Sequence, residues 1–226
     1  QADAFVKALK AAVEDGSVPQ SRIDDAVRRI LLVKFRLGLF DASTPDPATL
    51  DAVRSDEHIA LAREAVHKSV VLRKNEDAAL PLSRDADLIL VAGASADNIG
   101  LQSGGWTISW QGSAGRITEG TTLLDGIEAL AGADARVEYS AQGLFTDLGS
   151  ETADVAIVVV GEKPYAEGVG DRADLSLSSA DVDLIDKVRG LATRLIVVVV
   201  AGRPLVLTEQ LAQIDALVAA WLPGSE

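Results

Sequence analysis

Charged side chains gather at 161–177, GEKPYAEGVGDRADLSL, directly after the apolar run 155–160. The run indicates a strand buried on both faces of a parallel sheet. Ligands of open parallel sheets bind beyond the carboxyl ends of the strands. General acid catalysis requires a carboxyl near a leaving-group oxygen, with a pKa raised by an apolar or anionic setting. Glu162 and Glu167 qualify by type, and we expect Glu167, on the glycine-flanked crest, to donate the proton.

The same segment also admits plainer interpretations. A lone loop glutamate can be a solvated surface charge with no catalytic role. Glu162 leaves the strand directly and is therefore stiffer, so we expect it to be structural. Asp171 and Arg172 resemble a local ion pair that fixes the return of the loop.

Two of the three tryptophans lie four residues apart in 102–112, QSGGWTISWQG, a segment too rich in glycine for a stable helix. Indole faces stack on the apolar faces of sugar rings, and amphipathic aromatic side chains suit half-wet sites. Alternatively, the indoles close the end of the sheet as core residues. We favour that packing role for Trp106 and the sugar-binding role for Trp110.

The remaining candidate residues favour structural roles. Arg203 follows the apolar run 195–200, and we expect it to bridge elements rather than to face a ligand. His58 and His67 lack a third ligand at suitable spacing, so we predict no metal site. Phosphate-loop, dinucleotide, zinc-protease and serine-hydrolase motifs are missing from the sequence, and we predict no cofactor.

Composition narrows the classes of partner. The formal net charge is −13, which disfavours nucleic acid and anionic membrane surfaces and suits a neutral substrate. The longest apolar run, 195–201, is far shorter than the roughly 20 residues of a membrane-spanning helix. There is no cysteine, and hence no disulfide or thiolate nucleophile.

From residue 70 onward, predicted strands and helices alternate, as in a parallel sheet covered on both faces. The expected strands are 70–73, 88–92, 136–139, 155–160, 195–200 and 216–221, and the expected helices are 121–131, 179–192 and 207–213. The predicted fold is an α/β protein: a three-layer α/β sandwich with a mostly parallel sheet of about six strands.

The first 40 residues predict two amphipathic helices, 2–15 and one that begins at Ser21, with Asp24 in an imperfect capping box and Gly38 after its last turn. Two such helices cannot form a core alone, so we expect them to finish a domain that lies upstream. A proline-rich linker, 41–54, follows. A third helix begins at Ser55, and the sandwich domain covers 55–226.

Four segments, in order, resemble glycoside hydrolase family 3, the β-glucosidase and exo-β-glucanase family. Residues 21–41 are similar to the end of its (β/α)8 barrel domain, and 104–112 to a substrate loop. Residues 161–177 are similar to its acid/base loop, and 201–226 to late strands of its second domain. The tryptophan segment resembles the exo-glucanase branch more specifically.

The resemblance implies a retaining, exo-acting enzyme that removes glucose from the non-reducing ends of a β-glucan or β-glucoside, located outside the cell or in the periplasm. Glu167 matches the acid/base, Trp110 an aromatic platform and Trp106 its companion. The barrel with its nucleophilic aspartate is not in these residues, so we expect the chain to act with an upstream barrel domain and to be inactive alone.

Two other classes of function stay open. A non-catalytic glycan-binding or scaffold sandwich would share the fold without the chemistry. A flavodoxin-like nucleotide binder fits least, because acidic residues in the loop would repel phosphate.

Overall fold

Runs of β-branched and small apolar residues form a six-stranded sheet in the order β1-β6-β5-β4-β2-β3. The computed structural model describes residues 2–41 and 46–226, and the sheet lies in the second range. The strands are β1 Val71–Asn75, β2 Leu88–Ala92, β3 Arg136–Ser140, β4 Ala153–Gly161, β5 Ala192–Val200 and β6 Ala216–Trp221. Strand β1 runs antiparallel to β6, whereas the other neighbours pair in parallel.

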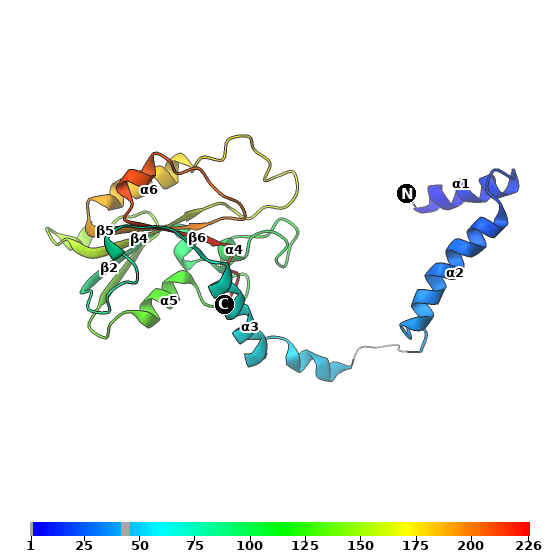
Figure 1. Cartoon of the computed structure of the whole chain (residues 1–226), viewed down its shortest axis with the longest axis horizontal. Coiled ribbons are helices and arrows are strands. Elements are labelled where there is room, and N and C mark those ends of the chain that lie inside the picture. The colour runs from blue at the N-terminus through cyan, green and yellow to red at the C-terminus, as the bar shows by residue number, and fades with distance from the viewer. Residues whose placement is uncertain (1, 42–45) are drawn as a thin grey trace. The chain divides into compact units, whose positions relative to one another are not determined.

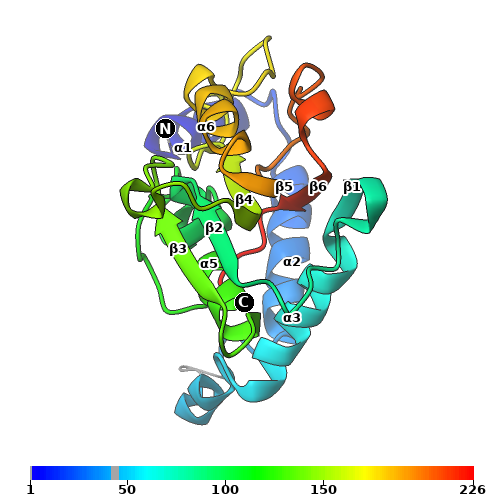
Figure 2. The same cartoon turned by 90° about the vertical axis from the view of Figure 1, so that its left-hand side faces the viewer.

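Helices cover both faces of this sheet. Helix α6 (Ser179–Arg189) lies on one face, and α3 (Asp56–Ser69) and α5 (Leu123–Leu130) lie on the other (Figure 1). Figure 2 shows β2 and β4 between α6 and α5. Alternate residues of β4 serve two separate cores: Val158 belongs to the core that contains Ile185 of α6, and Ile157 to the core that contains Leu124 of α5. Burial on both faces explains the continuous apolar runs, and the predicted three-layer sandwich is confirmed.

Some predicted boundaries were wrong. The edge strand β1 lies at 71–75 rather than 70–73, because its last two residues pair with Ala216 and Leu217. The helix expected at 207–213 is only a 3-10 turn, Gln210–Gln213. The reason lies at Asp215, whose N–H donates to the Leu195 carbonyl while its carboxylate accepts from the Leu195 N–H. The chain is thereby drawn into the sheet after a single turn.

The chain divides into two units, Gln1–Ser55 and Asp56–Glu226. In the first unit, α1 spans Ala2–Glu14 and α2 spans Gln20–Arg36. The capping box expected from Ser21 was wrong, because α2 begins at Gln20 after an extended Pro19 that makes no side-chain cap. The predicted end is confirmed: Gly38 has φ 66°, and the Leu39 N–H donates to the Lys34 carbonyl.

Apolar side chains of the first unit are exposed. Neither α1 nor α2 has a buried residue, and Phe5, Ile30 and Phe35 are each at least 60% exposed. Residues 42–45 of the predicted linker lie outside the described residues, and its later part forms a 3-10 turn at Pro47–Ala52.

Thr122 caps α5, the helix that supports the face opposite α6. Its hydroxyl accepts from the Asp125 N–H at 3.0 Å, and the Asp125 carboxylate accepts from the Thr122 N–H at 2.8 Å. These bonds, the backbone one foremost, lower the pKa of Asp125. The pair is a capping box, which satisfies two amide groups that the helix itself cannot.

We predict that Thr122→Val, which removes the hydroxyl at nearly constant volume, lowers the free energy of unfolding of the full chain by about 1 kcal/mol. Thr122→Ser should retain most of the stability, and Thr152→Val, at an exposed threonine, is the matched control. Urea unfolding checks this; equal stability of the two valine variants would contradict it.

Candidate active site

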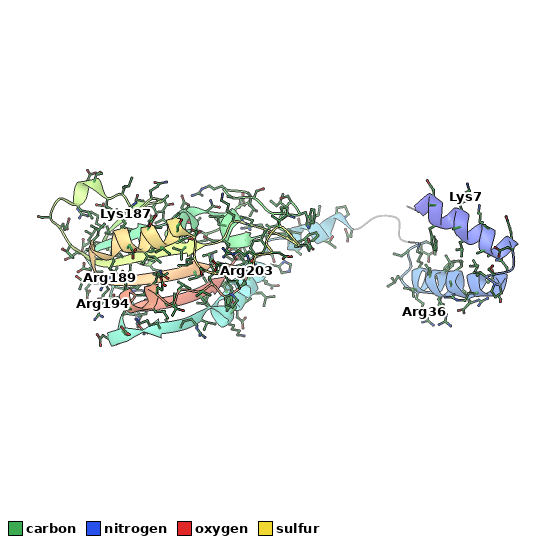
Figure 3. The ribbon with its side chains drawn as sticks, turned by 90° about the horizontal axis from the view of Figure 1, so that it is seen from above. Lys7, Arg36, Lys187, Arg189, Arg194 and Arg203 are labelled. Atoms are coloured by element: carbon green, nitrogen blue, oxygen red, sulfur yellow. The ribbon has the colours of Figure 1, made fainter. Side chains whose placement is uncertain are left out.

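Two loops leave the sheet together at the carboxyl ends of the neighbouring strands β2 and β4, which pair in parallel with Ala92 opposite Val158. The chain after β2 continues to α5 on one face, and the chain after β4 continues to α6 on the other. In open α/β sheets, such a reversal creates the crevice in which ligands bind. Figure 3 shows Arg203 at this edge and Arg194 at the opposite one.

The loop after β4, here the glutamate loop (162–172), carries Glu167 on its crest. Gly168 has φ 70°, and the Asp171 N–H donates to the Gly168 carbonyl at 3.1 Å, which turns the chain back. The side chain of Glu167 is exposed, but it is not left to bulk solvent, because the indole N–H of Trp110 donates to its Oε2 at 2.5 Å.

The loop that follows β2 and the short helix α4 (Ile99–Ser103), here the tryptophan loop (104–112), presents its indoles outward. Trp106 is 70% exposed and Trp110 56%, with ring centroids 6.3 Å apart. The packing role expected for Trp106 was therefore wrong. Trp106 and Ile108 have backbone φ angles of 60° and 63°, values that residues other than glycine rarely adopt. This backbone turns the apolar groups away from the sheet end instead of into it.

Glycine lets the two loops meet backbone to backbone. A Cβ on Gly105 would lie 2.0 Å from the Tyr165 carbonyl oxygen, and one on Gly112 would lie 2.7 Å from the Pro164 Cβ. Across the same seam, the Gln111 Oε1 accepts from the Ala166 N–H at 2.9 Å. The tryptophan loop therefore contacts the glutamate loop immediately before Glu167 and at Glu167 itself.

Glu162 anchors both ends of the glutamate loop. Arg203, beyond β5, donates to it through Nε and Nη2, the latter at 2.7 Å, and Arg172 pairs with it at 3.0 Å. The Tyr165 hydroxyl donates to Glu162 at 3.1 Å, and its pKa is raised by burial and then by that bond. The hydrogen bond with Glu162 raises the pKa of Arg203 above its ordinary value.

Glu162 and Arg203 thus have the structural roles expected of them. The ion pair expected between Asp171 and Arg172 was wrong, because Arg172 pairs with Glu162 instead.

A cavity of about 530 Å³ lies beneath the glutamate loop. Glu162, Tyr165, Arg172 and Arg203 line it, whereas Glu167 and the two indoles do not. Glu167 and the two indoles therefore lie outside this cavity, on the exposed side of the loops.

Three functional features could not be found from sequence: the bond from Gln111 to Ala166, the pairing of Arg172, and the contact at Gly105. The glycines beside the tryptophans were a signal that another backbone approaches closely, but they did not identify that backbone. Across residues 2–41 and 46–226, no cluster of His, Asp or Glu is arranged to hold a metal ion, and no helix is long and apolar enough to span a bilayer.

Comparison with known proteins gives consistent matches. Residues 70–226 match the model described as the glycosyl hydrolase family 3 C-terminal domain. The chain is 33% identical to the lysosomal beta glucosidase of Dictyostelium discoideum over 96% of its own length and 29% of that protein. It is 29% identical to the periplasmic beta-glucosidase of Salmonella typhimurium, over 98% of its length and 33% of that protein.

Solved structures agree. The exo-1,3/1,4-beta-glucanase of a Pseudoalteromonas species aligns with a TM-score of 0.87 at 37% identity, covering 99% of this chain and 29% of that one. The beta-glucosidase of Listeria innocua in complex with glucose aligns with a TM-score of 0.80 at 28% identity, covering 96% of this chain and 30% of that one. The chain thus spans about a third of the length of these relatives.

We predict that Gly105→Ala separates the two loops, because the added methyl would overlap the Tyr165 carbonyl. Amide hydrogen exchange in 162–170 should then become at least about tenfold faster, as expected for a segment that opens locally. Gly126→Ala is the matched control, since nothing lies within 4 Å of its added Cβ. Equal exchange in 162–170 for both variants would contradict the interlocked loops.

Proposed function

The chain belongs to glycoside hydrolase family 3, and on that premise we propose that it supplies the acid/base carboxyl, Glu167, of a retaining exo-acting β-glucosidase or β-glucan glucohydrolase. The observation that carries the proposal is the contact between Glu167 and Trp110 at the reversal point of the sheet. It places a carboxyl beside an exposed aromatic wall, where ligands of this architecture bind.

The proposed chemistry has two steps. In the first, an aspartate of an upstream barrel attacks the anomeric carbon, while Glu167 gives its proton to the glycosidic oxygen and the leaving sugar departs. In the second, Glu167 removes a proton from water, which displaces the aspartate and releases glucose with retained configuration. The two carboxyls of a retaining enzyme lie about 5–5.5 Å apart.

Trp110 has two tasks in this proposal. Its indole N–H holds one carboxylate oxygen of Glu167, which leaves the other oxygen for the proton transfer. Its exposed ring, with Trp106 beside it, offers a face for the leaving-group sugar. A neutral donor suits a carboxyl that must alternate between protonated and ionised forms.

The domain arrangement follows from the same premise. We propose that residues 1–40 complete an upstream barrel, that 41–54 link the domains, and that 55–226 form the acid/base domain. The exposed apolar side chains of α1 and α2 support this, because such a face must pack against something larger. The barrel would supply the nucleophile, and the chain alone would not turn over substrate.

The substrate we propose is a β-glucan or β-glucoside cleaved at its non-reducing end. The names of the relatives, beta-glucosidases and an exo-1,3/1,4-beta-glucanase, support this class. The location we propose is outside the cell or in the periplasm, which the relative named periplasmic supports.

In a protein that joins this chain to its barrel, Glu167→Gln should lower kcat/KM about 10²- to 10⁴-fold, the usual contribution of general acid–base catalysis. The loss should be greatest for alkyl glucosides, whose leaving groups need the proton, and least for 2,4-dinitrophenyl β-glucoside. Azide should partly restore turnover of the dinitrophenyl substrate. Near-normal hydrolysis of alkyl glucosides would instead favour a non-catalytic glycan-binding domain.

Trp110→Phe keeps an aromatic face but removes the donor to Glu167, whereas Trp110→Ala removes both. We expect the Phe variant to lower kcat chiefly for poor leaving groups and the Ala variant to raise KM for oligosaccharides as well, since one stacking contact is worth about 0.5–1.5 kcal/mol. Steady-state kinetics on laminaribiose and aryl glucosides separates the two tasks. Identical parameters for the two variants would show that the aromatic face is irrelevant, and a Phe variant that behaves like the unmodified protein would show that the indole N–H is irrelevant.

A further inference from the structure

Gln111 joins the two loops at the residue before Glu167. Its Oε1 accepts the Ala166 N–H at 2.9 Å, and Ala166 itself is only 6% exposed. Its Nε2 is buried and finds no hydrogen-bond partner within the described part of the chain. The orientation of the amide is fixed, because a backbone N–H can bond only to the oxygen end.

This arrangement is not what stability alone would select. A buried donor without a partner lowers the stability of the fold, and a buried polar group of this kind requires an explanation. The bond to Ala166 supplies that explanation, because it holds the backbone at the residue before Glu167.

The peptide unit between Tyr165 and Ala166 is held on both edges. Its carbonyl oxygen lies against Gly105, so closely that a Cβ there would be 2.0 Å away. Its N–H is bonded to Gln111. With this plane fixed from the tryptophan loop, the direction in which the chain leaves toward Glu167 depends on few remaining torsions.

Consecutive residues of the tryptophan loop therefore bind consecutive residues of the glutamate loop. Gln111 binds the Ala166 backbone, and Trp110 binds the Glu167 carboxylate. We propose that Gln111 is a positioning residue for proton transfer by Glu167. The inference rests on the proposed acid/base role of Glu167 and adds the residue that fixes its backbone.

A neutral amide is suited to this position. A methionine has similar length but no acceptor, and would leave the Ala166 N–H unpaired. A glutamate would retain an acceptor but would place a second negative charge next to the carboxyl it serves, and like charges at close range repel.

The test compares Gln111→Met with Gln213→Met in the protein that joins this chain to its barrel. Gln213 is the matched control because its Nε2 donates to Asp186 at 3.0 Å near the opposite edge of the sheet, remote from both loops. Values of kcat/KM are measured for a series of β-glucosides, from 2,4-dinitrophenyl to methyl.

Gln111→Met should lose about 10- to 100-fold on methyl β-glucoside, in line with the cost of a misplaced catalytic group, and less than about threefold on the dinitrophenyl substrate, which needs little acid assistance. Gln213→Met should stay within about twofold throughout, because the acid is untouched. A uniform loss across the series, or none, would overturn the proposal. If Glu167→Gln itself leaves hydrolysis of methyl β-glucoside intact, the proposed function fails; if only Gln111→Met does so, this inference alone fails.

A second measurement uses the unmodified full chain and does not depend on how the variant folds. The Ala166 amide should exchange with deuterium at least about tenfold more slowly than that of Lys163, an exposed residue of the same loop whose N–H meets no acceptor among the described residues, because the Ala166 N–H is bonded and buried. Comparable exchange at the two positions would show that Gln111 does not hold the backbone.

Discussion

The contact between the Tyr165–Ala166 peptide and the tryptophan loop is the constraint on which the site depends. The contact is possible because Gly105 has no side chain and because Gln111 reaches across to the Ala166 N–H. Without it, the crest of the glutamate loop would be an ordinary mobile surface turn, and Glu167 one more solvated charge in a chain whose net charge is −13. The two glycine-rich loops hold each other in place. Glu167 is thereby fixed in position while its side chain stays exposed.

The two glutamates of this loop, Glu162 and Glu167, have different partners and therefore suit different roles. Glu162 lies among Arg203, Arg172 and a tyrosine hydroxyl, so its charge is neutralised and its position is tied to two strand ends. Glu167 is held by a neutral indole N–H at an exposed edge. A carboxylate bound by two guanidinium groups is well suited to anchor a loop, whereas a carboxylate held by one neutral donor stays exposed at the surface.

Much of the fold was predictable because burial on both faces leaves a clear signature. The bounds of β2 and β6 agree with their apolar runs, and β4 and β5 differ only by short extensions. The sequence indicated which residues gather at this edge of the sheet, but not the contacts that join them. The bond from Gln111 to Ala166 joins positions 55 residues apart, and no local pattern encodes which loops meet. The outward direction of Trp106 depends on left-handed backbone in the tryptophan loop. Residues other than glycine rarely adopt that conformation, so the sequence did not predict it.

We propose that these two interlocked loops hold Glu167 over a sugar that is shared with a barrel domain. A crystal structure of the protein that joins this chain to its barrel, with a glucose-like inhibitor bound, tests it most directly. We expect the Glu167 carboxyl about 5–5.5 Å from a barrel aspartate, with the Trp110 indole against the leaving-group side of the ligand. A separation beyond about 6.5 Å, the range of inverting enzymes, or a Glu167 side chain turned away from the ligand, would contradict it.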